Sequence, residues 1–219
     1  MDNFVNNFRD ILYPALLETL YMSLLSTFLG FLIAVIPGVL LAVWDKNGLK
    51  ENKVYYSALD FFINMIRSFP FIILIIVLMP FTRIVVGTSI GTTATIVPLV
   101  LGIAPYLAKM IEASLKEVNK EVIEASKSYG ASNIQIIFKV MFVESLPSII
   151  NGLTLTLIVV IGFSAMAGTV GGGGLGDVAI RYGYERFRVD IMIQTVIVLL
   201  ILVQLIQLIG NTLYKMTKR

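Results

Sequence analysis

Two long stretches on either side of a central polar loop carry no charged residue, and they constrain the fold more than any other feature. They cover residues 87–108 and 145–175. About 20 consecutive apolar residues cross the hydrocarbon core of a bilayer, so each stretch is long enough for a transmembrane helix. Charged residues make up only 14% of the 219 residues, whereas a soluble domain carries about a quarter. The sequence therefore predicts an all-α integral membrane protein.

Three further, mostly apolar stretches meet the same length criterion, which gives five predicted spans in one transmembrane domain over residues 1–219. The predicted spans are residues 20–43, 57–79, 90–110, 146–170 and 191–214. A polar loop over 112–145 separates the third span from the fourth, and external loops are expected over 81–89 and 171–190. Residues 1–10 lack the basic region and cleavage site of a secretory signal, so no cleavable signal is expected.

The distribution of basic residues predicts the orientation. Lysine and arginine are enriched in the cytoplasmic loops of membrane proteins. The basic residues predicted inside are Lys46, Lys50, Lys53, Lys116, Lys120, Lys127, Lys139, Lys215, Lys218 and Arg219. Those predicted outside are Arg9, Arg83, Arg181, Arg186 and Arg188. This contrast favours an N-terminus outside and a C-terminus inside.

The second predicted span is interrupted by Arg67-Ser68-Phe69-Pro70, and only residues 71–79 follow before Pro80. A proline removes a backbone hydrogen bond and breaks or kinks a helix. Asp60, Asn64 and Arg67 share one helix face, and a charge inside a span usually faces the interior of the bundle. Two interpretations stay open. In the first, Arg67 pairs with Asp60 or freed carbonyls and holds the broken helix together. In the second, the break lines a substrate path.

The polar loop has a helical design of its own. Apolar residues recur at helical spacing at Ile111, Leu115, Val118, Val122, Ala125 and Tyr129. Gly130 is placed to end that helix, and Ser132 with Gln135 forms a capping box that would start another. Alternatively, Asn119 caps a separate short helix with Glu121 in its first turn. Paired helices with a defined turn favour a docking surface for a soluble partner over a solvated loop.

Glu124-Ala125-Ser126, Gly130 and Val140 resemble the EAA loop of permease subunits in binding-protein-dependent ABC importers. The sequence departs from that pattern at Phe142 and Val143, where the family often has Leu-Pro. The resemblance implies the type I importer permease fold, with a cytoplasmic coupling helix that docks on an ATPase dimer. The coupling residues it implies are Glu121, Glu124, Ala125, Ser126, Gly130 and Ala131.

A wider resemblance covers nearly the whole chain and is to the permease of the bacterial methionine ABC importer. The motifs that carry it are residues 67–74, 80–83, 86–91, 96–99 and 104–105, the segment from Ser164 to Gly176, and Tyr182-Gly183-Tyr184. The resemblance implies a second copy of the chain as partner, a methionine-binding lipoprotein at the outer face, and import of D- or L-methionine by alternating access. The residues expected to line the path or its gate are Arg67, Ser68, Pro70, Ser164 and Met166. A permease for another amino acid is the alternative.

Several other kinds of site are excluded or weakened. The sequence has no P-loop, so ATP and Mg²⁺ are expected on the partner ATPase, with no cofactor in this chain. It has no His and no Cys, which removes the commonest ligands of a metal site and leaves Ser164 without a histidine base. A membrane-embedded enzyme is therefore a weak alternative. Gly171, Gly173 and Gly176 match a dinucleotide motif outside its required context and are expected to form a flexible connector. No nucleic-acid partner is expected.

Overall fold

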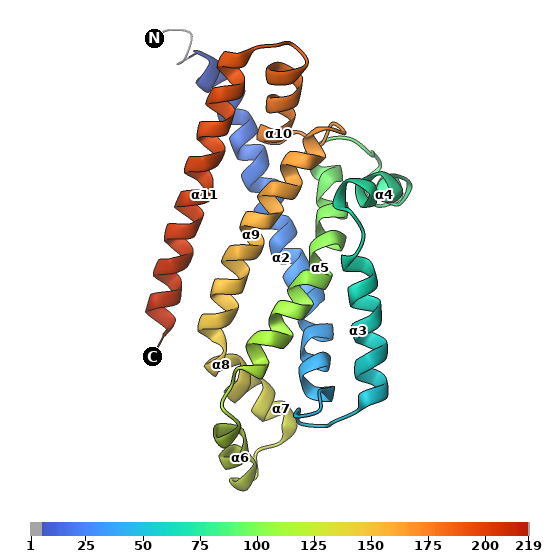
Figure 1. Cartoon of the computed structure of the whole chain (residues 1–219), viewed down its shortest axis with the longest axis vertical. Coiled ribbons are helices and arrows are strands. Elements are labelled where there is room, and N and C mark those ends of the chain that lie inside the picture. The colour runs from blue at the N-terminus through green and yellow to red at the C-terminus, as the bar shows by residue number, and fades with distance from the viewer. Residues whose placement is uncertain (1–5, 219) are drawn as a thin grey trace. The chain divides into compact units, whose positions relative to one another are not determined.

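The computed structural model describes residues 6–218, which form helices and their connections without a strand. Arg219, predicted on the cytoplasmic side, lies outside the described residues. The elements in Figure 1 are η1 (Phe8–Leu12), α2 (Tyr13–Trp44), α3 (Lys53–Arg67), α4 (Phe71–Val86), α5 (Thr92–Lys116), α6 (Lys120–Ser128), α7 (Asn133–Gln135), η2 (Ile136–Met141), α8 (Phe142–Glu144), α9 (Leu146–Gly168), α10 (Gly174–Val178), η3 (Ala179–Tyr184) and α11 (Val189–Thr217).

Within the described part of the chain, four helical stretches are long and apolar enough to cross a membrane. A fifth span is counted when α3 and α4 are taken together as one interrupted span. The chain also divides into two compact units. Unit 1 contains Met1–Leu29, Phe69–Ile103 and Leu155–Leu208, and unit 2 contains Gly30–Ser68, Ala104–Thr154 and Ile209–Arg219.

The helix that begins at Lys53 ends at Arg67, as the motif around Pro70 predicts. The Asn52 side chain caps its start by accepting a hydrogen bond from the Tyr55 amide at 3.1 Å. The expectation that the following apolar run ends before Pro80 was wrong, because α4 continues through Pro80 to Val86. A proline inside a membrane helix is tolerated where neighbouring groups satisfy the freed backbone. The loop after α4 therefore begins at Gly87, not at residue 81.

In unit 1, aromatic and glycine contacts pack α4 against its neighbours. The Phe71 and Phe163 rings are stacked with their centroids 4.2 Å apart, which joins α4 to α9. A Cβ atom at Gly102 would lie 3.1 Å from the Phe71 ring, so the small residue allows α5 to approach that ring closely. Phe163 thus belongs to the packing of the unit, beside the Ser164 that sequence reasoning considered as a nucleophile.

The glycine-rich segment of unit 1 is packed, and the expectation of a flexible connector was wrong. Gly174, Leu175, Gly176 and Val178 of α10 are buried. The Gly174 amide donates to a carboxylate oxygen of Glu18 at 2.7 Å, and the Leu175 amide donates to the Thr19 hydroxyl at 2.8 Å. The first amides of α10 therefore donate hydrogen bonds to residues of α2, which are distant in the sequence. No local sequence motif predicts this contact.

The core of unit 2 forms where α2 and α5 approach closely. Leu41, Leu107 and Ile111 are fully buried. A Cβ atom at Gly38 would lie only 2.8 Å from the Ala108 carbonyl oxygen, so a small residue is needed at that contact. This packing fixes the end of α5 from which the polar loop departs.

Candidate functional site

The polar loop contains a break that separates α5 from α6. Helix α5 ends at Lys116, and the Asn119 side chain caps α6 by accepting a hydrogen bond from the Glu121 amide at 2.9 Å. The alternative with a cap at Asn119 is therefore confirmed, and a single helical face running from Ile111 to Tyr129 was wrong. The periodic apolar set divides at this break because Ile111 belongs to the core, whereas Tyr129 is 92% exposed.

The turn between α6 and α7 is held by its own backbone and caps. Gly130 has a φ of +79°, and the Ala131 amide donates to the Ser126 carbonyl oxygen at 3.1 Å. The Ser132 hydroxyl accepts from the Gln135 amide at 3.4 Å, while the Gln135 side chain accepts from the Ser132 amide at 2.9 Å. Both the helix stop at Gly130 and the capping box are confirmed. Within unit 2, α6 and α7 extend past the end of α5 (Figure 1).

The α6–α7 surface, which we define as residues 121–138, leaves apolar and acidic side chains exposed together. Ile134 is 70% exposed and Phe138 is 59% exposed, and Tyr129 is exposed as well. Glu121 and Glu124 are exposed, and their carboxylates accept no hydrogen bond from residues 6–218. Large exposed apolar groups beside unpaired charges are typical of a surface that contacts another protein.

Two hollows in this region are lined by four of the six predicted coupling residues. One is open and is lined by residues that include Ser126, Gly130 and Ala131. The other has a volume of about 180 Å³ and is lined by residues that include Asp45, Lys116 and Glu124. Ala125 lies exposed on α6 between these positions. Glu121, the remaining predicted coupling residue, lies exposed in the first turn of α6.

Asp45, which follows the end of α2, is tied to this region by an ion pair. The Lys116 ammonium lies 2.7 Å from its carboxylate. Burial raises the pKa of Asp45, but hydrogen bonds from Lys116 and from the Asn47 amide outweigh it and hold that pKa below its usual value. The loop after α2 is therefore anchored to the C-terminal end of α5 by a charged carboxylate.

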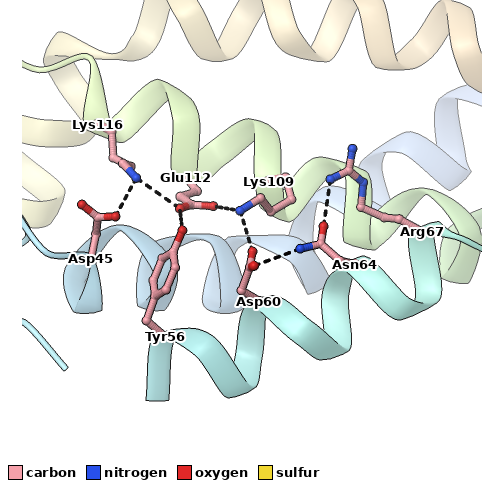
Figure 2. A network of polar contacts seen from close by, with 8 residues as sticks. All are labelled: Asp45, Tyr56, Asp60, Asn64, Arg67, Lys109, Glu112 and Lys116. Carbon is pink, nitrogen blue, oxygen red and sulfur yellow. Dashed lines mark hydrogen bonds and ion pairs between the residues drawn. The ribbon is translucent and has the colours of Figure 1, made fainter. Parts of the chain in front are cut away.

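A network of polar side chains connects α3 with α5 (Figure 2). Lys109 forms ion pairs with Glu112 and, at 2.8 Å, with Asp60. The Tyr56 hydroxyl donates to Glu112 at 2.9 Å, and Lys116 lies 3.5 Å from the same carboxylate. Glu112 is 3% exposed, so these contacts compensate the removal of its charge from water.

Arg67 stands at the end of this network and is joined to it through Asn64 (Figure 2). The Asn64 amide donates to Asp60 at 2.9 Å and accepts from Arg67 at 3.3 Å. The guanidinium also lies over the Tyr106 ring, 5.8 Å from its centroid. A direct pair between Arg67 and Asp60, one of the interpretations left open by the sequence, is not formed.

Sequence reasoning identified the polar face of α3 but missed its partners on α5. Lys109, Glu112 and Lys116 recur at spacings of three and four, which places them on one helix face. That periodicity was available in the sequence. What it could not indicate is that this face meets α3, because the pairing crosses more than 40 residues of chain.

The remaining path candidates belong to different units: Ser164, Met166 and Pro70 to unit 1, and Ser68 to unit 2. Ser164 is buried, and its hydroxyl donates to the Ile161 carbonyl oxygen of its own helix at 2.8 Å. Met166 is 49% exposed in the same unit. Ser68 donates its hydroxyl to the Asn64 carbonyl oxygen at 2.8 Å, and Pro70 is exposed just before α4. Within residues 6–218 no group of His, Cys, Asp or Glu is arranged to hold a metal ion.

Comparison with known proteins gives relatives along nearly the whole chain. The chain is 48% identical over 94% of its length to the probable D-methionine transport system permease protein MetI of Vibrio cholerae, and covers 92% of that protein. It is 49% identical over 91% of its length to the methionine import system permease protein MetP of Bacillus subtilis, and covers 90% of that protein.

Solved structures give the same result. A crystal form of the MetNI methionine ABC transporter in an inward-facing conformation matches 95% of this chain and 97% of its own, with a TM-score of 0.93 and 43% identity. An amino acid ABC transporter crystallised with histidines, at 19% identity and a TM-score of 0.75, shares the fold. The family model described as "Binding-protein-dependent transport system inner membrane component" matches residues 34–219. The chain therefore belongs to the family of inner-membrane components of binding-protein-dependent transport systems, as a multi-pass permease subunit of a transporter.

Proposed function

We propose that this chain is the permease subunit of an ATP-driven methionine importer and forms the membrane path by alternating access. The observation that supports this most strongly is the similarity to two methionine transport permeases at 48% and 49% identity over more than nine-tenths of the chain. D-methionine, L-methionine or both are the substrates that these relatives suggest.

ATP hydrolysis is assigned in this proposal to a separate ATPase dimer that docks on the α6–α7 surface. The sequence has no P-loop that could hold ATP and Mg²⁺. The exposed Tyr129 and the unpaired Glu124 carboxylate supply apolar contact area and charge for a protein partner. The capped turn at Gly130 gives these groups fixed positions, which mechanical coupling needs.

The proposal also includes the orientation of the chain in the membrane and the positions of its partners. The α6–α7 surface lies in the cytoplasm, the N-terminus lies outside, and a second copy of the chain completes the path. A methionine-binding lipoprotein delivers the substrate at the outer face. The excess of lysine in the segments assigned to the inside supports this orientation.

Co-purification followed by a binding screen tests this function. The tagged chain is expressed together with a candidate ATPase and a candidate binding protein, and the captured complex is analysed. The ATPase is expected to co-purify, and the binding protein is expected to be stabilised thermally by methionine more than by any other amino acid. Absence of the ATPase from the captured complex would contradict the proposal that the chain belongs to an importer. Stabilisation of the binding protein only by a different amino acid would show that this amino acid, and not methionine, is the substrate.

A further inference from the structure

Arg67 is the cation of the polar network that lacks an acidic partner. Lys109 and Lys116 between them contact the three carboxylates of the network, those of Asp45, Asp60 and Glu112. Among residues 6–218 no carboxylate lies within 4.0 Å of the Arg67 guanidinium, and its only hydrogen bond goes to the Asn64 amide oxygen. A guanidinium has five N–H donors, so most of its capacity is free.

The position of Arg67 along α3 argues against a location at the membrane surface, because α3 is the first part of the interrupted span. It is the last of the 15 residues of a helix that begins at Lys53. At 1.5 Å per residue, the helix carries it about 20 Å from that start, against a hydrocarbon core about 30 Å thick. Trp44 and Tyr55, whose rings are 5.3 Å apart, mark the start of α3 as the end nearer the membrane surface.

An arginine exposed at that depth cannot face lipid without a large cost. Its exposed side in the single chain must therefore meet a water-filled path or a polar group supplied from outside the chain. Asn64 on one side and the Tyr106 ring on the other limit where the guanidinium lies. The free N–H groups form the planar fork that binds a carboxylate through two hydrogen bonds.

We propose that Arg67 binds the α-carboxylate of the amino acid in transit, which makes it a substrate-binding residue of the membrane path. This inference rests on the proposed function. An amino acid brings its ammonium group together with its carboxylate, so its binding adds no net charge to the membrane interior. A second copy of the chain is a poorer source of the carboxylate, because Asp60 and Glu112, the acidic residues nearest Arg67 in the network, are already paired with lysines.

Cysteine chemistry tests this proposal on the complete complex, because the chain has no cysteine of its own. Arg67→Cys is reconstituted with a cysteine-free ATPase and the binding protein in proteoliposomes. Methionine uptake is expected to fall roughly 10- to 100-fold, the effect of losing one charged hydrogen-bonding group. ATP hydrolysis stimulated by the binding protein should persist. Modification with a cationic methanethiosulfonate should restore several-fold more uptake than modification with a neutral one of similar size.

Protection from labelling identifies the ligand. Millimolar L-methionine should slow modification of Arg67→Cys, and L-methioninamide, which lacks the carboxylate, should not. Arg83→Cys on α4 is the matched control, because Arg83 is also exposed, and methionine should leave its labelling rate unchanged. The proposal would be overturned if Arg67→Cys kept full uptake or if both compounds protected it equally. It would also be overturned if the Arg67→Cys complex were recovered in lower yield and methionine gave no protection. Absence of uptake by the unmodified complex would instead contradict the proposed function.

Discussion

At Gly130 the backbone has a φ of +79°, which a residue branched at Cβ adopts only with strain. An added Cβ would have no heavy atom within 4 Å, so backbone conformation alone decides what the position tolerates. Gly130→Val is expected to insert and fold normally but to capture less ATPase and to lose methionine uptake, because the turn moves. Pull-down and uptake measure this. Gly130→Asn, which accepts the left-handed conformation, is the control and should retain both activities. Equal ATPase capture by all three chains would show that the turn does not position a docking surface.

Glu124 differs from Gly130 because its contribution depends on charge. Its carboxylate accepts no hydrogen bond from the described residues and lies on the exposed face of α6. Glu124→Lys is therefore expected to leave the fold intact and to weaken ATPase binding through repulsion of the group that the carboxylate meets. The affinity for the ATPase, measured in detergent, should fall more than tenfold. Glu185→Lys, the same charge reversal at an exposed position in the other unit, should not change it. Unchanged affinity of the Glu124→Lys chain would show that residue 124 faces solvent and does not contact the ATPase.

Within unit 2, the contact between α3 and the C-terminal part of α5 depends on Glu112. This buried carboxylate accepts from Tyr56 and contacts two lysines that each keep a second carboxylate in its absence. Glu112→Ala therefore leaves mainly the Tyr56 hydroxyl without a partner, at a cost of about 1–3 kcal/mol. We expect a lower thermal stability in detergent and a lower folded yield. Glu121→Ala, at an exposed position whose side chain forms no hydrogen bond or ion pair within residues 6–218, should stay within about 0.5 kcal/mol of the parent. Equal stability of the two variants would contradict the role of the network.

Element boundaries were predictable where a local signal determines them. The caps at Asn119 and Ser132 and the stop at Gly130 each depend on a few neighbouring residues, and the structure contains all three. The end of α4 was mispredicted because the propensity of Pro80 to end a helix was weighted above membrane burial, which stabilises a helix across it.

Contacts between distant residues were not predictable in the same way. The glycine-rich segment is ordered because Glu18 and Thr19 bind its amides across 156 residues of chain. The Asp60–Lys109 pair likewise depends on which faces of two helices meet. Composition suggests that the glycine-rich segment is flexible and that α3 has a polar face. It does not indicate which residues either of them contacts.

At the scale of the whole molecule, the proposed orientation can be tested in intact cells because the chain has no cysteine. Cysteines introduced at Asn47, Ser128 or Thr217 are expected to be shielded from membrane-impermeant reagents. Cysteines at Asn6, Thr88 or Arg186 should be labelled. Permeabilised cells provide the control, since all six positions should then react. Labelling of residue 128 from outside would place the α6–α7 surface on the wrong side for an ATPase.

The most direct test of the proposed function is uptake of radiolabelled methionine by proteoliposomes that contain the purified chain, its ATPase, the binding protein and trapped ATP. The complete complex should accumulate methionine against a gradient. Vesicles that lack the ATPase, or that contain a non-hydrolysable ATP analogue, should accumulate none, and the chain alone should hydrolyse no ATP. Accumulation that persists without the ATPase, or a complete complex that hydrolyses ATP but never accumulates methionine, would contradict the proposal.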